Sequence, residues 1–234
     1  MVEIKNLTVV IKNQTLLDDV SCSLIPGRIS CFIGKSGAGK TTLLKSLVNL
    51  MPITSGTISI NNKQLAELTY QKKSETIGYV FQDFNLFNNL TVLENCIDPL
   101  LVHGMQYKQA EERALQELKK RGLENHVHKY PTQLSGGQQQ RAAIARSLCL
   151  QPQILLLDEP TASLDPINTQ ELVTTLQELA AQNLIIGVSS QDMHFVQKIF
   201  DRVYYLQAGT IIDFCDDIQK INYVPNIKSF INIA

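Results

Sequence analysis

The segment with the clearest chemistry is Gly34-Lys35-Ser36-Gly37-Ala38-Gly39-Lys40-Thr41, which fits the spacing G-x-x-x-x-G-K-[ST] in full. It follows the short apolar run Ile29–Ile33 and precedes leucines at helical spacing, so it is predicted to join a buried strand to the start of a helix. Its glycines allow backbone N–H groups to converge on a phosphate at the positive end of that helix. Lys40 is expected to reach the β- and γ-phosphates, and the Thr41 hydroxyl to bind Mg²⁺.

Two adjacent acids, Asp158 and Glu159, follow the apolar run Ile154–Leu157. Carboxylates at the C-terminal end of a buried strand lie at the ligand crevice of an open α/β sheet. Asp158 is therefore expected to hold Mg²⁺ through water, and Glu159 to polarise an attacking water as a general base.

A third motif, Leu134-Ser135-Gly136-Gly137-Gln138-Gln139-Gln140-Arg141, places a serine cap and two glycines at the start of a predicted helix. Such a helix start is a second site for an anion. A second anion-binding helix start is not needed within a single active site, because the Lys40 loop already binds the phosphates there. The motif makes sense if each chain completes the nucleotide site of a neighbouring chain.

The composition excludes several classes of protein. Hydrophobic residues make up 44% and charged residues 18% of the 234 residues, which supplies a sizeable core and excludes disorder. The formal net charge of −1 argues against a protein that grips a nucleic acid backbone. Apolar runs such as Leu184–Val188 are far shorter than the ~18 residues that span a bilayer, and the N-terminus does not resemble a secretion signal. A cytosolic location is therefore expected.

The elements around these motifs predict an α/β domain with a helical segment in its middle. Val2–Val10 is expected as an edge strand, and Thr57–Ile60 and Ile77–Phe81 as a hairpin-like pair. From about Phe84 to Cys149 the pattern is helical. Helices are expected over Gln109–Arg121, about Gln138–Leu150, near Thr169–Ala181, and in the C-terminal tail from about Asp216 to Ala234, which is expected to pack back on the core.

The cysteines and histidines indicate no second site. The five cysteines are scattered singly, so reduced and mostly buried thiols are expected. His126 and His128 alternate with Val127 in a polar stretch without further ligands nearby, so both are expected at the surface.

Over nearly its whole length the sequence resembles the ATP-binding cassette (ABC) family. The Lys40 loop, the Ser135 motif and the Asp158 motif occur in the family's order, with 118 residues from Lys40 to Asp158. Gln82 matches the family's glutamine that senses the γ-phosphate and Mg²⁺, and Asp165 lies in the loop that crosses to the partner subunit. Softer features resemble the ATPases of bacterial polar-amino-acid importers, namely the glutamines 138–140, the stretch from Phe81 to Phe87, and Gly209-Thr210-Ile211.

This resemblance implies a P-loop NTPase core of the ABC type, α/β in class. The core carries an N-terminal antiparallel β subdomain and an inserted helical subdomain at about residues 84–150, within one ATP-binding domain over residues 1–234. The implied protein is an ATPase that binds ATP and Mg²⁺ and pairs with a second ABC subunit as a homodimer or heterodimer. Its other implied partners are integral membrane permease subunits and a solute-binding protein, and its implied location is the inner face of the bacterial cell membrane.

The resemblance also implies the residues of the site. Catalysis is assigned to Glu159, Gln191 and Lys40, and the metal to Thr41, Gln82 and Asp158. The nucleotide is assigned to Ile11, Gly34, Lys35, Ser36, Gly37, Ala38, Gly39, Lys40, Thr41, Thr42, Gln82, Ser135, Gly136, Gly137 and Asp165.

Two positions depart from the family's pattern. The aromatic residue that the family stacks on adenine falls on Ile11, which lacks a π face, so weaker ATP binding and poorer base discrimination are expected. The family's histidine at the γ-phosphate falls on Gln191, which donates a hydrogen bond but carries no charge, so slower hydrolysis is expected. The same departures leave open that the chain is the weaker half of a heterodimer.

Three functions fit the sequence at this point. The first is an ATPase subunit that powers uptake of polar amino acids or a similar small solute. The second is an ABC ATPase for another cargo, such as lipid, lipoprotein or metal. The third is a non-transport ABC protein, against which two facts count: the distance from Gln82 to Ser135 leaves no room for the coiled coil of a repair protein, and the chain holds one cassette where a translation factor needs two.

Overall fold

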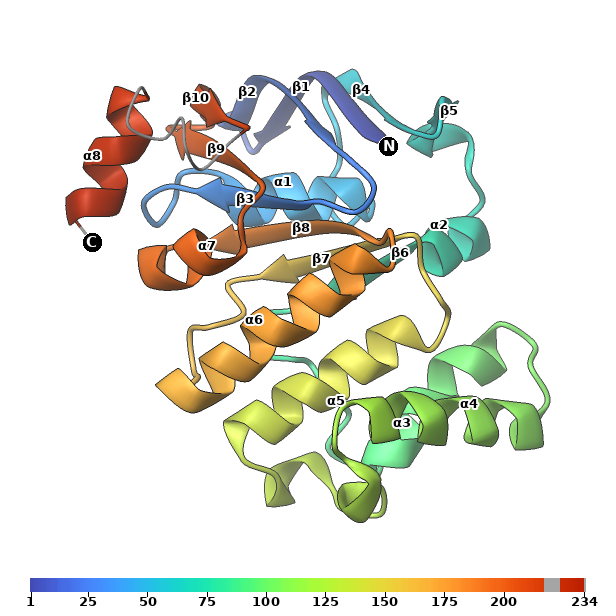
Figure 1. Cartoon of the computed structure of the whole chain (residues 1–234). Coiled ribbons are helices and arrows are strands. Elements are labelled where there is room, and N and C mark those ends of the chain that lie inside the picture. Colours follow the sequence, from blue (N-terminus) through green and yellow to red (C-terminus); the bar gives the residue numbers. More distant parts are fainter. Residues whose placement is uncertain (217–223, 234) are drawn as a thin grey trace.

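The computed structural model describes residues 1–216 and 224–233, and a six-stranded sheet forms its centre (Figure 1). The strand order is β10-β9-β3-β8-β7-β6, and all neighbouring strands are parallel except β10 and β9. Every residue of β3, β7 and β8 is buried, as their apolar sequences predict for strands covered on both faces. The strands are β3 (Ile29–Ile33), β6 (Ile77–Val80), β7 (Ile154–Asp158), β8 (Ile185–Ser190), β9 (Arg202–Gln207) and β10 (Thr210–Cys215).

A second, antiparallel sheet has the order β2-β1-β4-β5. Its strands are β1 (Val2–Ile11), β2 (Gln14–Leu24), β4 (Ser55–Ile60) and β5 (Lys63–Gln64). The prediction of an edge strand over Val2–Val10 is wrong, because β1 pairs with β2 on one side and with β4 on the other.

The predicted hairpin of Thr57–Ile60 with Ile77–Phe81 is also wrong. β4 belongs to the antiparallel sheet, whereas β6 pairs with β7 in the central sheet. The intervening chain forms the short helices η1 (Leu65–Glu67) and α2 (Tyr70–Thr76), which carry it from one sheet to the other.

Helix α1 (Lys40–Leu47) lies between the two sheets (Figure 1). Its residues Leu43, Leu44 and Leu47 are buried in one apolar core with strand residues from both sheets. Leu50 is exposed because the helix ends before it, at Leu47. The phosphate-loop helix is thus held on two sides.

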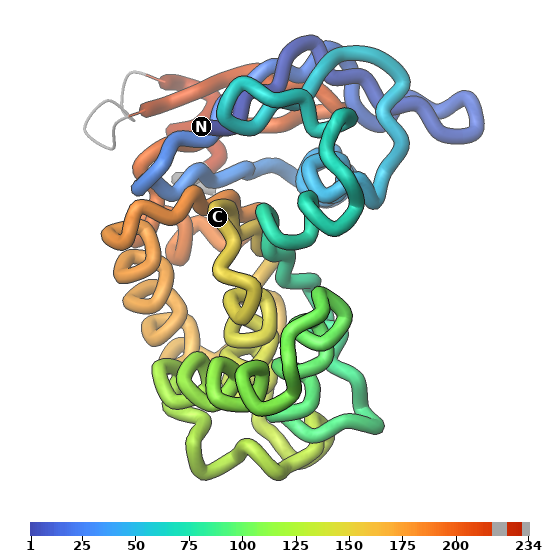
Figure 2. The backbone as a smooth tube through the Cα atoms, turned by 90° about the vertical axis from the view of Figure 1, so that its right-hand side faces the viewer, coloured from blue at the N-terminus to red at the C-terminus, as the bar shows by residue number. Residues whose placement is uncertain are grey.

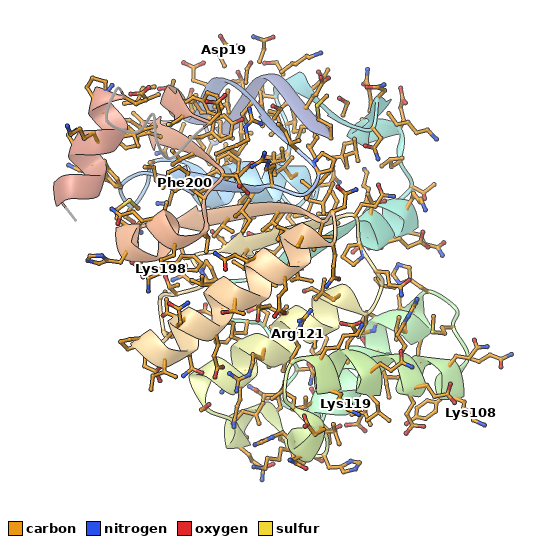
Figure 3. The ribbon with its side chains drawn as sticks, viewed as in Figure 1. Asp19, Lys108, Lys119, Arg121, Lys198 and Phe200 are labelled. Atoms are coloured by element: carbon orange, nitrogen blue, oxygen red, sulfur yellow. The ribbon has the colours of Figure 1, made fainter. Side chains whose placement is uncertain are left out.

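The helices between β6 and β7 form a lobe that extends away from the sheets (Figure 2). They surround an apolar core of their own, and Lys108 of α4 lies on the outer side of the lobe (Figure 3). The elements are α3 (Val92–Val102), α4 (Tyr107–Lys120), η2 (Glu124–His126), η3 (Pro131–Gln133) and α5 (Gly136–Leu148). His128 is exposed as predicted, but the prediction for His126 is wrong: this residue is half-buried because its ring contacts Gln138 of α5.

The face of the central sheet opposite α1 is covered by α6 (Pro166–Ala181) and α7 (Met193–Ile199). Helix α8 (Pro225–Ile233) packs back on the sheet through Ile227 and through Phe230, whose ring lies 4.9 Å from that of Tyr205. The tail prediction is therefore confirmed for α8, while residues 217–223 and 234 of that range lie outside the described residues.

The thiols follow the prediction, since four of the five cysteines are buried and Cys22 is half-buried. Within residues 1–216 and 224–233, no helix combines the length and apolar composition needed to cross a membrane.

Candidate nucleotide site

The loop Gly34–Gly39 joins β3 to α1 at the C-terminal edge of the central sheet. Gly37 and Gly39 have φ angles of 79° and 103°, in the left-handed region that glycine adopts without strain. A Cβ atom on Gly39 would also lie 2.9 Å from the carbonyl oxygen of Leu16. Because α1 begins at Lys40, the first N–H groups of the helix have no carbonyl partner within it and can bind an anion.

The ammonium group of Lys40 is buried in this loop, with a side chain that is 5% exposed. Its Nζ donates to the carbonyl oxygens of Gly34, at 2.8 Å, and Lys35, at 3.3 Å. It also forms an ion pair with Glu159, at 3.1 Å from Oε1. The lysine of the loop and the second acid of the Asp158 motif are therefore in direct contact.

Three hydroxyl groups converge on the buried carboxylate of Asp158, at the end of β7. Thr41 and Ser189 donate to Oδ1 at 2.8 and 2.6 Å, and Tyr79 donates to Oδ2 at 3.1 Å. Burial, and then the adjacent carboxylate, raise the pKa of Tyr79 well above its ordinary value, so this phenol stays a donor at physiological pH. The carboxylate of Asp158 is thus fixed next to the first turn of α1.

Glu159 follows directly and is held from the end of β8. Its φ of 45° is left-handed, which is uncommon for a residue with a side chain and recurs at functional sites. Its N–H group donates to Ser189, to the carbonyl oxygen at 3.1 Å and to Oγ at 3.0 Å. Its carboxylate accepts from Gln191 twice, from the backbone N at 3.0 Å and from Nε2 at 3.2 Å. The two donors of Gln191 thus orient the carboxylate, which lies against the ammonium group of Lys40.

These groups surround a hollow of about 300 Å³ that is large enough for a polyphosphate. Its lining comprises Gln14, Leu16, the loop and helix residues 36–42, Gln82, Glu159 and Gln191. Ile11 is not among the lining residues: it pairs with Gln14 across the turn between β1 and β2, and the side chains from β2 reach the hollow instead.

The Ser135 motif lies elsewhere, at the start of α5, and does not line this hollow. Ser135 is exposed and caps the helix: its Oγ accepts from the Gln138 N–H at 3.3 Å, and its own N–H donates to Gln138 Oε1 at 3.0 Å. A Cβ atom on Gly137 would lie 1.9 Å from Oδ1 of Asn168, so only glycine fits beside that side chain.

Asp165 lies next to this helix start because Asn168 connects the two. The Asp165 carboxylate accepts from Asn168 through the backbone N at 2.8 Å and through Nδ2 at 2.7 Å, and caps α6. These hydrogen bonds lower the pKa of Asp165 below its ordinary value. The Ser135 and Asp165 motifs thus form one exposed surface, separate from the hollow of the same chain.

Four residues of the site were not predicted from the sequence: Tyr79, Ser189, Gln14 and Leu16. Ser189 lies beside Asp158 in the register of β7 and β8. An alignment of the ends of these two apolar segments as neighbouring parallel strands would have predicted it. Gln14 and Leu16 gave no such signal, because their place depends on how the antiparallel sheet sits over the loop.

Comparisons with known proteins agree with this geometry. The family model for the ABC transporter matches residues 17–162. The L-cystine transport system ATP-binding protein TcyN of Escherichia coli (strain K12) is 39% identical over 221 residues, which are 91% of this chain and 88% of that protein. The glutamine transport ATP-binding protein GlnQ of the same organism is 36% identical over 216 residues, which are 91% of this chain and 90% of that protein.

Solved structures give the same result. A dimeric ATP-binding cassette in a post-hydrolysis state, bound to ADP and Pi, superposes with a TM-score of 0.84 at 33% identity, over 92% of this chain and 98% of that one. A nucleotide-free cassette from an ABC transporter shares the fold, with a TM-score of 0.88 at 22% identity over 98% of both chains. The motifs, the fold and the relatives together show that this chain belongs to the ABC transporter family, as an ATP-binding and ATP-hydrolysing subunit.

Proposed function

We propose that this chain powers the uptake of polar amino acids or a similar small solute through separate membrane subunits. The observation that carries the ATPase part is the hollow lined by Lys40 and Glu159 at the ends of β3 and β7, with Asp158 buried behind it and bonded to Thr41 of its lining. The cargo rests on relatives whose names refer to cystine, glutamine and glutamate transport. One cassette domain over residues 1–234, with the helical part at about 84–150 as an insertion, fits this function.

In this proposal the loop holds the phosphates of ATP. The N–H groups of residues 34–42 bind the phosphate oxygens, and Lys40 exchanges Glu159 for the β- and γ-phosphates. The base lies toward Ile11, where Gln14 and Leu16 add contacts. Mg²⁺ would be held by Thr41 and, through water, by Asp158 and Gln82.

The donor set fits Mg²⁺, which takes hydroxyl, carboxylate and amide oxygens and keeps several waters. Among the described residues no group of three or more His, Cys, Asp or Glu side chains is placed to hold a metal, so the ion needs the phosphates of ATP as ligands. When bound, it neutralises charge on the β- and γ-oxygens.

Hydrolysis follows from the position of Glu159 beside Lys40. Once Lys40 has turned to the phosphates, the Glu159 carboxylate is free to accept the proton of a water that attacks the γ-phosphorus. The bond from the γ-phosphorus to the bridging oxygen breaks, and ADP and phosphate leave. Gln191 keeps Glu159 oriented and offers its amide N–H to the γ-phosphate.

A second ABC subunit completes the site. The start of α5 at Ser135, Gly136 and Gly137 receives the γ-phosphate bound by the Lys40 loop of the other subunit, and Asp165 lies in the loop that crosses to that subunit. The dimeric cassette bound to ADP and Pi supports pairing. The pair is a homodimer or a heterodimer. The heterodimer is worth testing because Gln191 stands where the family has a histidine.

The membrane partners dock on a groove between α2, α3 and the loop after β6. This groove measures about 520 Å³ and presents Tyr70, Phe81, Phe87 and Pro99 beside the charges of Asp98 and Arg146. We propose that it receives a short helix of an integral membrane permease, which places the chain at the inner face of the bacterial cell membrane. A solute-binding protein completes the system, and no nucleic acid takes part.

The test is Mg²⁺-dependent ATP hydrolysis by the purified chain and its Glu159→Gln variant. The variant should lose activity about 10²–10⁴-fold and accumulate as an ATP-bound pair on size-exclusion chromatography, because a general base contributes that much. In cells that carry the protein, its loss should reduce uptake of labelled cystine, glutamine or glutamate, with rescue by the wild type and not by Glu159→Gln. Normal uptake of all three would redirect the cargo to lipid, lipoprotein or metal, and hydrolysis only beside a second ABC chain would establish the heterodimer.

A further inference from the structure

His126 occupies an unexpected place in the helical lobe. Its ring is half-buried, and its Nε2 lies 3.1 Å from Nε2 of Gln138, in the first turn of α5. The neighbouring His128 is exposed and has no hydrogen bond to its side chain among those found in the described residues. His126 is thus a side chain with a defined partner in the Ser135 motif.

The chemistry of the capping box fixes which atom donates in this contact. The N–H of Ser135 is a donor and needs an oxygen, so Oε1 of Gln138 points to Ser135. Nε2 of Gln138 then points to His126, and an amide nitrogen only donates. In this contact the ring therefore accepts through Nε2, while its Nδ1 is buried and has no hydrogen-bond partner among the described residues.

The same box determines which donors of the helix start stay available. Ser135 Oγ takes the N–H of Gln138, and Gln138 Oε1 takes the N–H of Ser135. The N–H groups of Gly136 and Gly137, at the first two helical positions, have no carbonyl partner within the helix. With the Ser135 hydroxyl, they form a set of three donors that runs from exposed Ser135 through half-buried Gly136 to Gly137, which is buried beside Asn168.

The backbone around His126 is anchored to the lobe, which places the ring beside the first turn of α5. The N–H of His126 donates to Leu123 at 2.9 Å, and the next residue, Val127, accepts from the N–H of Leu93 at 2.9 Å. Leu93 belongs to the first turn of α3, the helix that also contributes Pro99 to the proposed docking groove. His126 thus lies between the start of α3 and the start of α5.

We propose that His126 is a positioning residue for ATP hydrolysis at the site of the paired subunit. By accepting from Gln138 it holds the capping box closed and keeps the three donors of Ser135, Gly136 and Gly137 aimed at the γ-phosphate. This inference rests on the proposed function, because it requires the helix start of one subunit to complete the nucleotide site of the other.

The test compares a variant that removes the acceptor with one that keeps it. His126→Leu fills a similar volume without an acceptor, and its kcat for ATP should fall about three- to tenfold, as expected for one lost neutral hydrogen bond. His126→Gln carries an amide oxygen at a similar reach and should restore kcat. His128→Leu is the matched control on the same loop and should behave like the wild type.

A second readout separates positioning from folding. ATP binding at protein concentrations too low for pairing, and the melting temperature, should be the same in His126→Leu and the wild type, since His126 does not line the hollow. An unchanged kcat in His126→Leu, equal losses in both His126 variants, or a parallel loss of ATP binding and melting temperature would each overturn the proposal.

A further variant distinguishes failure of this inference from failure of the proposed function. Ser135→Arg should abolish turnover in a paired enzyme because the large cation blocks the helix start. If Ser135→Arg is inactive while His126→Leu is fully active, only the role of His126 is wrong. If Ser135→Arg keeps full turnover, the shared site itself is wrong.

Discussion

The two regions that we propose to bind phosphate differ in how their polar groups are satisfied. At the strand ends the polar groups are side chains, and they bind one another. Lys40 pairs with Glu159, and three hydroxyls donate to Asp158. At the start of α5 the binding groups are backbone N–H groups, beginning next to exposed Ser135, and the first of these donors have no partner among the described residues. The polar groups of the strand-end region thus have partners within that region, whereas the helix start, called the open region below, keeps donors available for a ligand.

The difference indicates which region needs a second subunit. A buried charged group is stable only when it is paired and hydrogen-bonded, so the strand-end region must be complete within one chain. An exposed helix start is solvated in the single chain and can wait for an anion delivered by another molecule. Breaking the first region should therefore damage the chain itself, and breaking the second should damage only the pair.

The largest effect is expected at Lys40. Lys40→Met removes the cation that pairs with Glu159 and should abolish detectable ATP binding, with a loss of about 1–3 kcal/mol in the free energy of unfolding. Isothermal titration with ATP and urea unfolding measure the two quantities. Lys45→Met, on the same helix, is the control. ATP binding at wild-type affinity by Lys40→Met would contradict the phosphate contact of Lys40, and an unchanged free energy of unfolding would contradict the role of the ion pair.

The next effect is expected at the open region. Gly137→Ala places a methyl group against the amide of Asn168, so this side chain must turn away from the helix start and give up its hydrogen bond to Asp165, or the helix start must shift. Turnover should fall about 10²-fold, in the range for one lost preorganised donor, while ATP binding by the single chain stays unchanged. Gly136→Ala, whose methyl group would lie 3.3 Å from the nearest atom, should cost less. Equal losses in ATP binding and turnover would remove the contrast between the two regions.

A gain is expected at Gln191. Gln191→His should raise kcat about tenfold, because an imidazole can carry charge next to the γ-phosphate while the backbone N–H still orients Glu159. Gln191→Leu should lower kcat, because leucine has no side-chain donor. Steady-state assays of the two variants measure both changes. A histidine variant no faster than the wild type, beside a slow leucine variant, would mean that the amide replaces the histidine fully.

The smallest effect is expected at the edge of the hollow. Ile11→Tyr supplies an aromatic face for adenine and should lower the Kd for ATP about fivefold, near the lower end of the range for base stacking. Gln14→Ala measures how much the side chains from β2 already contribute. Titration with ATP and GTP shows whether base discrimination improves as well. Identical dissociation constants for wild type and Ile11→Tyr would show that the missing aromatic face at Ile11 does not weaken ATP binding.

The sequence predicted what depends on neighbours along the chain. The Lys40 loop, the buried strand before Asp158 and the Ser135 cap are local patterns, and the structure contains each of them. What depends on distant pairing was missed. The assignment of β4 and β6 to different sheets follows from their partners β1 and β7, and no local pattern encodes those partners.

The same reasoning explains the missed side chains. Tyr79 and Ser189 reach Asp158 from the two strands that flank β7, so only the strand order brings them together. His126 and Gln138 are separated by a loop whose path is set by the packing of the lobe. A polar histidine in a polar stretch carries no sign of this contact.

The ion pair between Lys40 and Glu159 has a consequence for the end of the catalytic cycle. With this carboxylate in place, the chain itself supplies a counter-ion for Lys40, and free phosphate must compete with Glu159 for that ammonium group. When phosphate departs after hydrolysis, the ammonium passes to a group already present and is never left buried without charge compensation. Product release is thereby assisted by the residue that is proposed to start the reaction.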